Sequence, residues 1–229
     1  MDQEYPSEIM LSAKDLSCCR DDRDLFVNLN FDIVGGEVVQ IVGSNGSGKT
    51  TLLRILCGLM DDYSGDIEWC RQPMNQCGEL YRAQLIHIGH NAGINPILTA
   101  EENLQWLLDI HGQGVADNRQ IVEALARVGL SGYEGVETHR LSAGQKRRVS
   151  LARLYIEEAP IWILDEPFTA IDKEGVRELE NLIFQHANRG GIVILTTHHS
   201  LQESASGLKQ IILDDLSGIH EASVDDDGV

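Results

Sequence analysis

The sequence predicts an α/β fold built on a mostly parallel sheet with helices on both faces, together with a strand-rich N-terminal portion and a helical insert. Two observations support this prediction. Short apolar runs typical of buried strands alternate with amphipathic segments along most of the 229 residues, as expected for consecutive βαβ units. One of these runs, residues 38–42, passes through a glycine-rich turn into a helical segment after Thr50, which is the layout of a phosphate-binding loop.

The first hundred residues contain most of the expected strands and the turns between them. Turn signals lie at residues 21–22 and 35–36, and the helix after Thr50 is expected to end at Gly58, a typical C-terminal cap. The expected strands are residues 9–11, 26–33, 38–42, 64–69 and 85–89.

Residues 97–158 are expected to be largely helical and to form an insert in the α/β core. Thr99 and Glu102 make a capping box that starts a helix running to residues 111–112. The expected elements that follow are helices over residues 118–128 and from Ser142 to Pro160, then strands 161–164 and 192–195 with a helix over 173–187 between them. We expect one domain over residues 8–215 and an acidic, disordered tail at residues 221–229.

Charge and composition narrow the class of partner. The chain has 36 acidic and 18 basic residues and a net charge of −18, so we expect no nucleic-acid partner and no attraction to an anionic lipid surface. No apolar run approaches the roughly 18 residues of a membrane span, and the first residues lack the pattern of a secretory signal. We therefore expect the chain to stay in the cytoplasm.

The five cysteines are odd in number and contain no CxxC pair. This spacing predicts reduced thiols rather than a disulfide framework or a zinc site. None of them lies in a CxxCH run or a Cys-Pro dipeptide, so we expect no direct haem binding by this chain.

Residues 43–51, GSNGSGKTT, match the phosphate-loop pattern GxxxxGK[ST] in full. Such a loop points backbone N–H groups and the positive end of a helix dipole at a polyphosphate. Lys49 is expected to reach the β- and γ-phosphates, and the Thr50 hydroxyl to bind Mg²⁺. The sequence thus predicts a P-loop NTPase core whose nucleotide contacts are Gly43, Ser44, Asn45, Gly46, Ser47, Gly48, Lys49, Thr50 and Thr51.

A pair of carboxylates follows the apolar strand at residues 161–164. Asp165 is suited to the Mg²⁺ shell, and Glu166 to orienting or deprotonating the attacking water. An acidic pair at the end of a strand is often a cap or a solvated turn, but a magnesium-nucleotide site requires such groups. We therefore predict that Asp165 binds the metal and that Glu166 is catalytic.

The run LSAGQKRRV at residues 141–149 predicts a second anion-binding tip. Ser142 and Gly144, with Gln145, stand at the start of a helix, where a hydroxyl and free N–H groups point outward. Two such tips in one chain indicate a head-to-tail homodimer, in which Ser142 of one subunit closes over the γ-phosphate held by Lys49 of the other. Lys146, Arg147 and Arg148 follow, and either a solvated basic face or an interface role fits them.

Together these runs resemble the motifs of ABC-transporter ATPases. The phosphate loop, LSAGQ, ILDEP, residues 168–172 and the Thr196-Thr197-His198 run occur in that family's order and spacing. The resemblance implies the ABC ATPase fold, with an antiparallel N-terminal β portion, and ATP and Mg²⁺ as ligands. It implies that Asp172 lies in the segment touching the partner's phosphate loop and that His198 contacts the γ-phosphate and Glu166. His199 is the neighbouring alternative, one residue further from the strand.

A closer resemblance is to the family of ATP-binding subunits of the cytochrome c maturation haem exporter. It rests on the GH…GI…LTAEEN run from residue 89, on LSAGQKRRVSLARL, on WILDEPFTAID and on VILTTH. It implies an ATP hydrolase, peripheral at the cytoplasmic face of the inner membrane, that drives integral membrane transporter subunits of a cytochrome c maturation complex.

Two positions depart from the ABC pattern. His90 stands where most of the family has a glutamine, and imidazole is a poorer Mg²⁺ ligand than an amide oxygen. Coupling to membrane subunits or positioning of water suits His90 better. Near Arg20 there is no aromatic residue to stack on adenine; the guanidinium of Arg20 can stack, or can simply be solvated.

Other functions remain open on the sequence alone. An ABC ATPase for a different small cargo would look the same, because this chain does not touch the cargo. A soluble ABC ATPase of DNA repair or ribosomes is disfavoured by the charge of −18 and by the lack of a long heptad segment. A P-loop kinase or GTPase does not explain the LSAGQ run.

Overall fold

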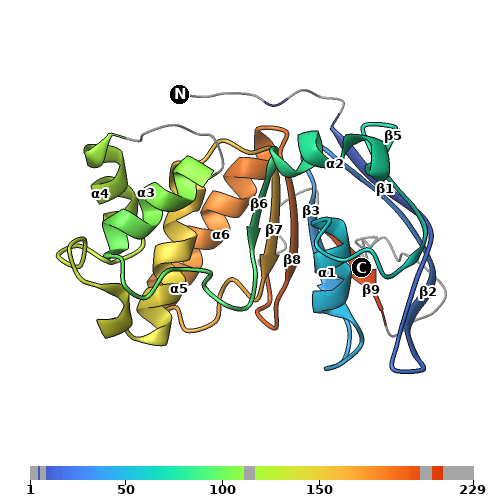
Figure 1. Ribbon diagram of the computed structural model, residues 1–229, viewed down its shortest axis with the longest axis horizontal. Helices are drawn as coiled ribbons and strands as arrows, with labels where there is room; N and C mark the ends of the chain where they lie inside the picture. The colour runs from blue at the N-terminus through green and yellow to red at the C-terminus, as the bar shows by residue number, and fades with distance from the viewer. Residues whose placement is uncertain (1–4, 6–8, 111–116, 202–207, 214–229) are drawn as a thin grey trace, which may run out of the picture.

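Two sheets form the framework of the protein (Figure 1), which is described by a computed structural model over residues 5, 9–110, 117–201 and 208–213. The larger sheet runs through the middle of Figure 1. Most helices lie on its left in that view, and α1 (Lys49–Leu56) and the smaller sheet lie on its right. The predicted α/β class, with a parallel sheet, an antiparallel N-terminal sheet and a helical region, is confirmed.

The larger sheet has five parallel strands in the order β6-β7-β8-β3-β9. Every residue of β7 and of β8 is buried, as a parallel sheet covered on both faces requires. The strands are β3 (Val38–Val42), β6 (Leu85–Ile88), β7 (Ile161–Asp165), β8 (Ile192–Thr196) and β9 (Leu208–Ile212).

The smaller sheet is antiparallel, in the order β2-β1-β4-β5. Its strands are β1 (Met10–Arg20), β2 (Arg23–Val34), β4 (Ser64–Trp69) and β5 (Gln72–Pro73). The prediction that the first strand covers only residues 9–11 was wrong. A register shift after Ala13, with Asp15 at φ 50°, interrupts the alternation of buried and exposed side chains, and such a bulge hides a long strand from a period-two reading.

Helices cover both faces of the parallel sheet. Helix α1 and the antiparallel sheet pack against one face of the parallel sheet, and helix α6 packs against the other face. The helices α3, α4 and α5 share a third apolar cluster with one another. The helices are α1 (Lys49–Leu56), α2 (Met74–Arg82), α3 (Ala100–Ile110), α4 (Asn118–Arg127), α5 (Ala143–Ala152) and α6 (Lys173–Asn188), with 3₁₀ turns at Thr138–Arg140 and Arg153–Tyr155.

The predicted helix from Ser142 to Pro160 is shorter than expected. It ends at Ala152, and a 3₁₀ turn follows, because the chain must then reverse into β7 through Pro160, whose carbonyl accepts from the N–H of Ile192. Helix α2 and strand β9 were not anticipated, although Met74, Cys77 and Tyr81 of α2 are buried at helical spacing.

Several expectations lie outside the described residues. These are the end of the helix predicted at residues 111–112, both limits of the predicted domain and the acidic tail at residues 221–229. Within the described residues, no helix has both the length and the apolar character that crossing a membrane requires.

Because the five strands are parallel, their carboxyl ends meet at one edge of the sheet. The loops after β3, β6, β7 and β8 all leave from that edge, which is where open α/β sheets bind ligands. The loop after β3 is the predicted phosphate loop, and the loop after β6 contains His90. Sheet topology thus brings four separate sequence motifs to one place.

Candidate active site

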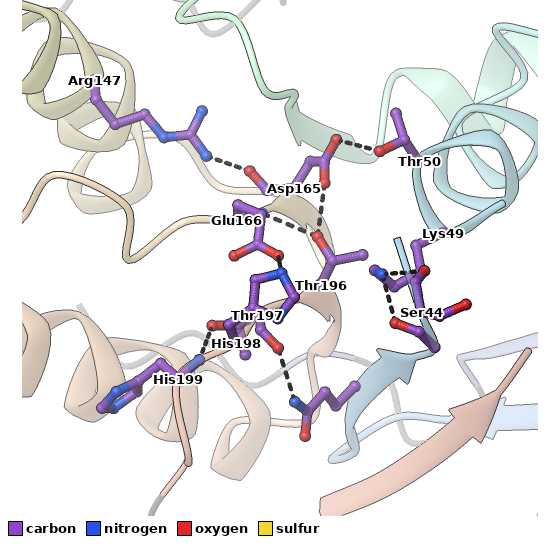
Figure 2. Close-up of polar contacts among 12 residues, drawn as sticks. Ser44, Lys49, Thr50, Arg147, Asp165, Glu166, Thr196, Thr197, His198 and His199 are labelled. Atoms are coloured by element: carbon purple, nitrogen blue, oxygen red, sulfur yellow. Dashed lines mark hydrogen bonds and ion pairs between the residues drawn. The ribbon is translucent and has the colours of Figure 1, made fainter. Parts of the chain in front are cut away.

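The phosphate loop joins strand β3, which lies between β8 and β9, to helix α1. Lys49 lies in the first turn of that helix and donates from Nζ to the carbonyls of Gly43, at 2.7 Å, and Ser44, at 2.9 Å. These two contacts hold the ammonium group against the loop (Figure 2). Thr51 is half-buried in the same turn.

At two positions of the loop there is no room for a side chain, so glycine is required. A Cβ on Gly43 would lie 2.4 Å from the hydroxyl of Ser47, and Gly48 combines φ 98° with only 2.9 Å between such a Cβ and the Cβ of Leu25. Gly46 also has positive φ, but a Cβ there would meet nothing within 4 Å. The loop is therefore compressed at its two ends and open in its middle.

The open part of the loop has the character of an anion site. Ser47 Oγ is buried without a hydrogen-bond partner in the protein. The N-cap of α1 is Gly48, and no side chain caps this helix, so its first N–H groups remain available beside the positive end of the helix dipole. A buried hydroxyl, free N–H groups and an ammonium around one loop suit the phosphates of a nucleotide.

A continuous hydrogen-bond network joins the phosphate loop to the ends of β7 and β8 (Figure 2). Thr50 Oγ1 donates to Asp165 Oδ2 at 3.0 Å, and Thr196 Oγ1 donates to Asp165 Oδ1 at 2.7 Å. The same Thr196 hydroxyl accepts from the N–H of Glu166 at 3.0 Å. Asp165 and Thr196 face each other in the β7–β8 register, so the sheet itself sets this geometry.

Glu166 has an unusual backbone. Its φ is 50°, in the left-handed region that costs a residue with a Cβ roughly 1–2 kcal/mol. Its N–H is held by both the hydroxyl and the carbonyl of Thr196. Strained backbone of this kind persists where surrounding contacts determine it, and it is frequent at functional sites. The positive φ directs the Glu166 side chain differently from an extended strand residue.

The two neighbouring histidines after β8 point to different partners. His198 Nε2 lies 3.6 Å from Glu166 Oε1, and its side chain is 73% exposed. His199 instead lies 3.1 Å from Glu180 Oε1 and stacks obliquely on Phe168, with ring centroids 5.0 Å apart. Only His198 therefore faces the acidic end of β7, as the sequence analysis expected.

Arg147 is a residue of this region that sequence reasoning did not single out. It is 6% exposed, so the alternative of a solvated basic face is wrong for this residue. Its guanidinium donates to the carbonyl of Gly89 and, at 2.5 Å, to the carbonyl of Asp165. Burial lowers the pKa of Arg147, an effect that the charge of Asp165 opposes.

A sequence signal for Arg147 did exist. Leu151 and Leu154 are spaced four and seven residues after it and are buried, which places Arg147 on the inward face of α5. Thr196 was likewise noted only as part of a motif. Its position at the end of β8, opposite Asp165, could have been inferred from parallel pairing of the two strands.

His90 is exposed and lines a cavity of about 380 Å³ that Thr50, His87 and Asp165 also line. It therefore opens toward the predicted metal ligands without an observed contact to either of them. His87 is largely buried, and burial lowers its pKa.

The predicted second tip is solvent-facing. Ser142 is exposed and caps α5 through a reciprocal pair with Gln145: the N–H of Gln145 donates to Ser142 Oγ at 3.2 Å, and the N–H of Ser142 donates to Gln145 Oε1 at 3.0 Å. In Figure 1, α5 and α1 lie on opposite sides of the parallel sheet. The structure thus does not bring Ser142 to the phosphate loop of its own chain.

The segment after β7 packs against the start of α5. A Cβ on Gly144 would lie 2.9 Å from the carbonyl oxygen of Ala170. Arg148 donates to Asp172 Oδ2 at 2.9 Å. This arginine therefore forms an ion pair within its own chain. The N–H of Gly175, together with Arg148, holds the pKa of Asp172 below its usual value.

Arg20 lies apart from these contacts. It ends β1 at the hairpin, its side chain is 63% exposed, and Nε lies 3.8 Å from Asp21 Oδ2. Within the described residues, no three His, Cys, Asp or Glu side chains gather in a way that could hold a metal ion.

Comparisons with known proteins agree with one another. The sequence pattern of the ABC transporter family matches residues 26–169. The cytochrome c biogenesis ATP-binding export protein CcmA of Vibrio cholerae is 52% identical over 206 residues, which span 90% of this chain and 99% of that protein. The CcmA protein of Escherichia coli K12 is 50% identical over 204 residues, 89% of this chain and 96% of that protein.

Solved structures of the same fold are also found. A putative ATP-binding ABC transporter protein from Pyrococcus furiosus has a TM-score of 0.76 at 25% identity, covering 90% of this chain and 98% of that chain. A dimeric ATP-binding cassette bound to ADP and Pi, in a post-hydrolysis state, has a TM-score of 0.78 at 23% identity, covering 92% and 97% of the two chains. At that identity the second likeness shows the fold alone.

Proposed function

The chain belongs to the ABC transporter family and, within it, to the cytochrome c biogenesis ATP-binding export proteins. From this membership we propose that it hydrolyses ATP as the motor subunit of a haem exporter. The observation that carries the proposal is the network from Thr50 through Asp165 and Thr196 to Glu166. It ties a phosphate loop to a carboxylate, as phosphoryl transfer to water requires.

Each residue of the network has a separate role in this proposal. The loop N–H groups and Lys49 bind the triphosphate and neutralise its charge. Thr50 and Asp165 would hold Mg²⁺, which fits a hydroxyl and a carboxylate and is usually completed by phosphates and water. When bound, the metal supplies charge neutralisation at the phosphates. Glu166 accepts the proton of the attacking water.

His198 complements Glu166. Its ring nitrogen faces Glu166 Oε1 at 3.6 Å while most of the ring is exposed. From that position His198 steadies the γ-phosphate and keeps the Glu166 carboxylate oriented. His90, on the wall of the neighbouring cavity, suits coupling or the positioning of water better than direct metal contact.

We infer that a second copy completes the site. Ser142 is exposed and Gly144 and Gln145 are half-buried at a tip that lies across the sheet from α1 of the same chain, so the tip is available to the phosphate loop of another molecule. In a head-to-tail homodimer Ser142 and Gly144 contact the γ-phosphate, and Asp172 lies near the partner's loop. Arg20 remains the proposed adenine contact, through its planar guanidinium.

The motor acts on membrane partners in this proposal. ATP-driven closure of the dimer is passed to integral membrane subunits of a cytochrome c maturation complex, with the chain peripheral on the cytoplasmic face of the inner membrane. The domain comprises residues 8–215 with the helical region 97–158 as its insert. The membrane partners deliver or release haem, and this chain does not bind haem directly.

The test is the variant Glu166→Gln in the complex purified with its membrane subunits. Loss of the general base is expected to lower ATP turnover by about 10²–10⁴-fold, while binding of a fluorescent ATP analogue stays within threefold of wild type. Asp61→Asn, an exposed carboxylate outside the network, is the matched control and is expected to leave turnover unchanged. Undiminished hydrolysis by Glu166→Gln would remove Glu166 from the mechanism.

A further inference from the structure

One peptide group, between Asp165 and Glu166, is held from both of its ends. Its carbonyl, on Asp165, accepts from the Arg147 guanidinium at 2.5 Å. Its N–H, on Glu166, donates to the hydroxyl and the carbonyl of Thr196, at 3.0 and 3.1 Å. The plane of this peptide therefore has little freedom to rotate.

The orientation of that peptide plane decides where the Glu166 carboxylate lies. The angle φ of Glu166 measures rotation about the bond that leaves this plane, and it is 50°. A residue with a Cβ adopts such a value only when its surroundings impose it. Thr196 imposes it from the β8 side, and Arg147 imposes it from the α5 side. Without Arg147 the Asp165 carbonyl loses its guanidinium donor, which is the α5 half of this clamp.

The second arm of Arg147 reaches a different loop. It donates to the carbonyl of Gly89, the residue directly before His90. Three residues along α5, Ser150 donates to the carbonyl of Ala92. Helix α5 thus holds the His90 loop at two points and the Asp165 carbonyl at a third, and the same helix begins at the exposed Ser142 tip.

We propose that Arg147 is a positioning residue, which holds the Asp165–Glu166 peptide and the His90 loop in fixed register with helix α5 so that Glu166 reaches the attacking water. The proposal rests on the proposed function, since it assigns Arg147 an effect exerted through Glu166. Two distinct guanidinium nitrogens serve two carbonyls, a geometry that the planar fork of arginine provides and a single ammonium reproduces only in part.

Two variants test this role in the complex purified with its membrane subunits. Arg147→Met keeps an unbranched apolar stem and removes both donors; we expect kcat to fall at least tenfold while the affinity for a fluorescent ATP analogue stays within threefold. Arg147→Lys keeps the charge, and we expect its kcat to lie between those of Arg147→Met and wild type. Arg119→Met, which removes an exposed arginine of α4, is the matched control and should retain kcat within twofold.

A double mutant separates positioning from general destabilisation. If Arg147 acts through Glu166, adding Arg147→Met to Glu166→Gln should lower single-turnover hydrolysis less than twofold further, because the two losses share one step. A full additional tenfold loss would overturn the proposal, as would a kcat for Arg147→Met within twofold of wild type. Should Arg147→Met fail to assemble, Arg147→Lys decides: at least a threefold loss of kcat supports the role, and wild-type kcat overturns it.

The outcomes distinguish this inference from the proposed function. If wild type hydrolyses ATP and Glu166→Gln does not, the motor function stands whatever Arg147 does. If Glu166→Gln retains full turnover, the function proposed for Glu166 fails first, and Arg147 has no carboxylate to position. Hydrogen exchange adds an independent measurement: Arg147→Lys is expected to speed exchange in residues 86–93 and 161–168 while leaving α6 unchanged.

Discussion

The imidazole of His198 lies 3.6 Å from the carboxylate of Glu166, measured from Nε2 to Oε1. The adjacent imidazole of His199 makes its contacts with Glu180 and Phe168 instead. Two identical side chains, one residue apart, therefore have separable roles. The first faces solvent at the edge of the predicted nucleotide site, and the second packs between the end of β8 and α6.

This separation predicts different consequences for the two alanine variants. His198→Ala should lower ATP turnover at least tenfold with little change in thermal stability, since its ring is mostly exposed. His199→Ala should lose about 1 kcal/mol of stability with the Glu180 contact and the ring packing, while keeping turnover within threefold. Turnover of the purified complex and thermal unfolding of the chain measure the two effects. The reverse pattern would transfer the γ-phosphate role to His199.

The Thr196 hydroxyl bridges Asp165 and Glu166, so its removal should affect turnover more than folding. Thr196→Val keeps the shape but leaves Asp165 Oδ1 without this donor, and we expect about 10–100-fold slower ATP hydrolysis. Thr196→Ser keeps the hydroxyl and should stay within threefold of wild type. Equal turnover in the two variants would show that the hydroxyl is irrelevant.

Gly144 is expected to be intolerant of a methyl group because of its own chain. The added Cβ would lie 2.9 Å from the Ala170 carbonyl, so Gly144→Ala must displace the segment after β7 or the start of α5. We expect a destabilisation of about 1–3 kcal/mol and weaker ATP-dependent dimerisation, followed by thermal unfolding and gel filtration. Gly135→Ala, where a Cβ meets nothing within 4 Å, is the matched control; an equal loss in both variants would contradict this explanation.

His186 makes stability depend on pH. It is fully buried and stacked on Trp162 with ring centroids 3.8 Å apart, and burial lowers its pKa from 6.5 to about 4. Between these values the unfolded state binds more protons than the folded state, so stability falls as pH drops from 6.5 to 4, by about 3 kcal/mol in all. His186→Phe replaces the imidazole with another aromatic ring that does not titrate.

Urea denaturation at pH 7, 5.5 and 4 compares the two proteins. The difference in unfolding free energy, wild type minus His186→Phe, should become more negative as the pH falls through this window. A difference that is constant with pH would show that another group accounts for the acid sensitivity.

Much of the fold could be predicted because its signals are local. The phosphate loop, the Ser142 cap and the apolar strand before Asp165 each lie within a few consecutive residues, so their patterns survive without knowledge of the tertiary structure. The parallel sheet followed from strands alternating with helices. Family membership and the α/β class are confirmed by the comparisons and the structure.

The features that were missed depend on contacts distant in sequence. Arg147 sits in a run of three basic residues, but it is buried, and its guanidinium donates to the carbonyls of Gly89 and Asp165, which are distant from it in the chain. The long β1 was hidden by a bulge at Asp15. The roles assigned to the phosphate loop, Glu166 and the Ser142 tip stay predictions, since they concern groups that bind from outside the chain.

The pairing of Asp165 with Thr196 across β7 and β8 also limits how this protein can change over evolutionary time. Side chains alternate between the two faces of a strand, so losing or gaining a single residue within Ile161–Asp165 would turn the carboxylate toward the wrong face and leave the threonine opposite another neighbour. Substitutions that keep residues 161–164 apolar and retain Asp165 are far easier to accommodate than any change in the number of residues in this strand. Length variation among descendants of this chain should therefore accumulate in the loops and spare these two strands.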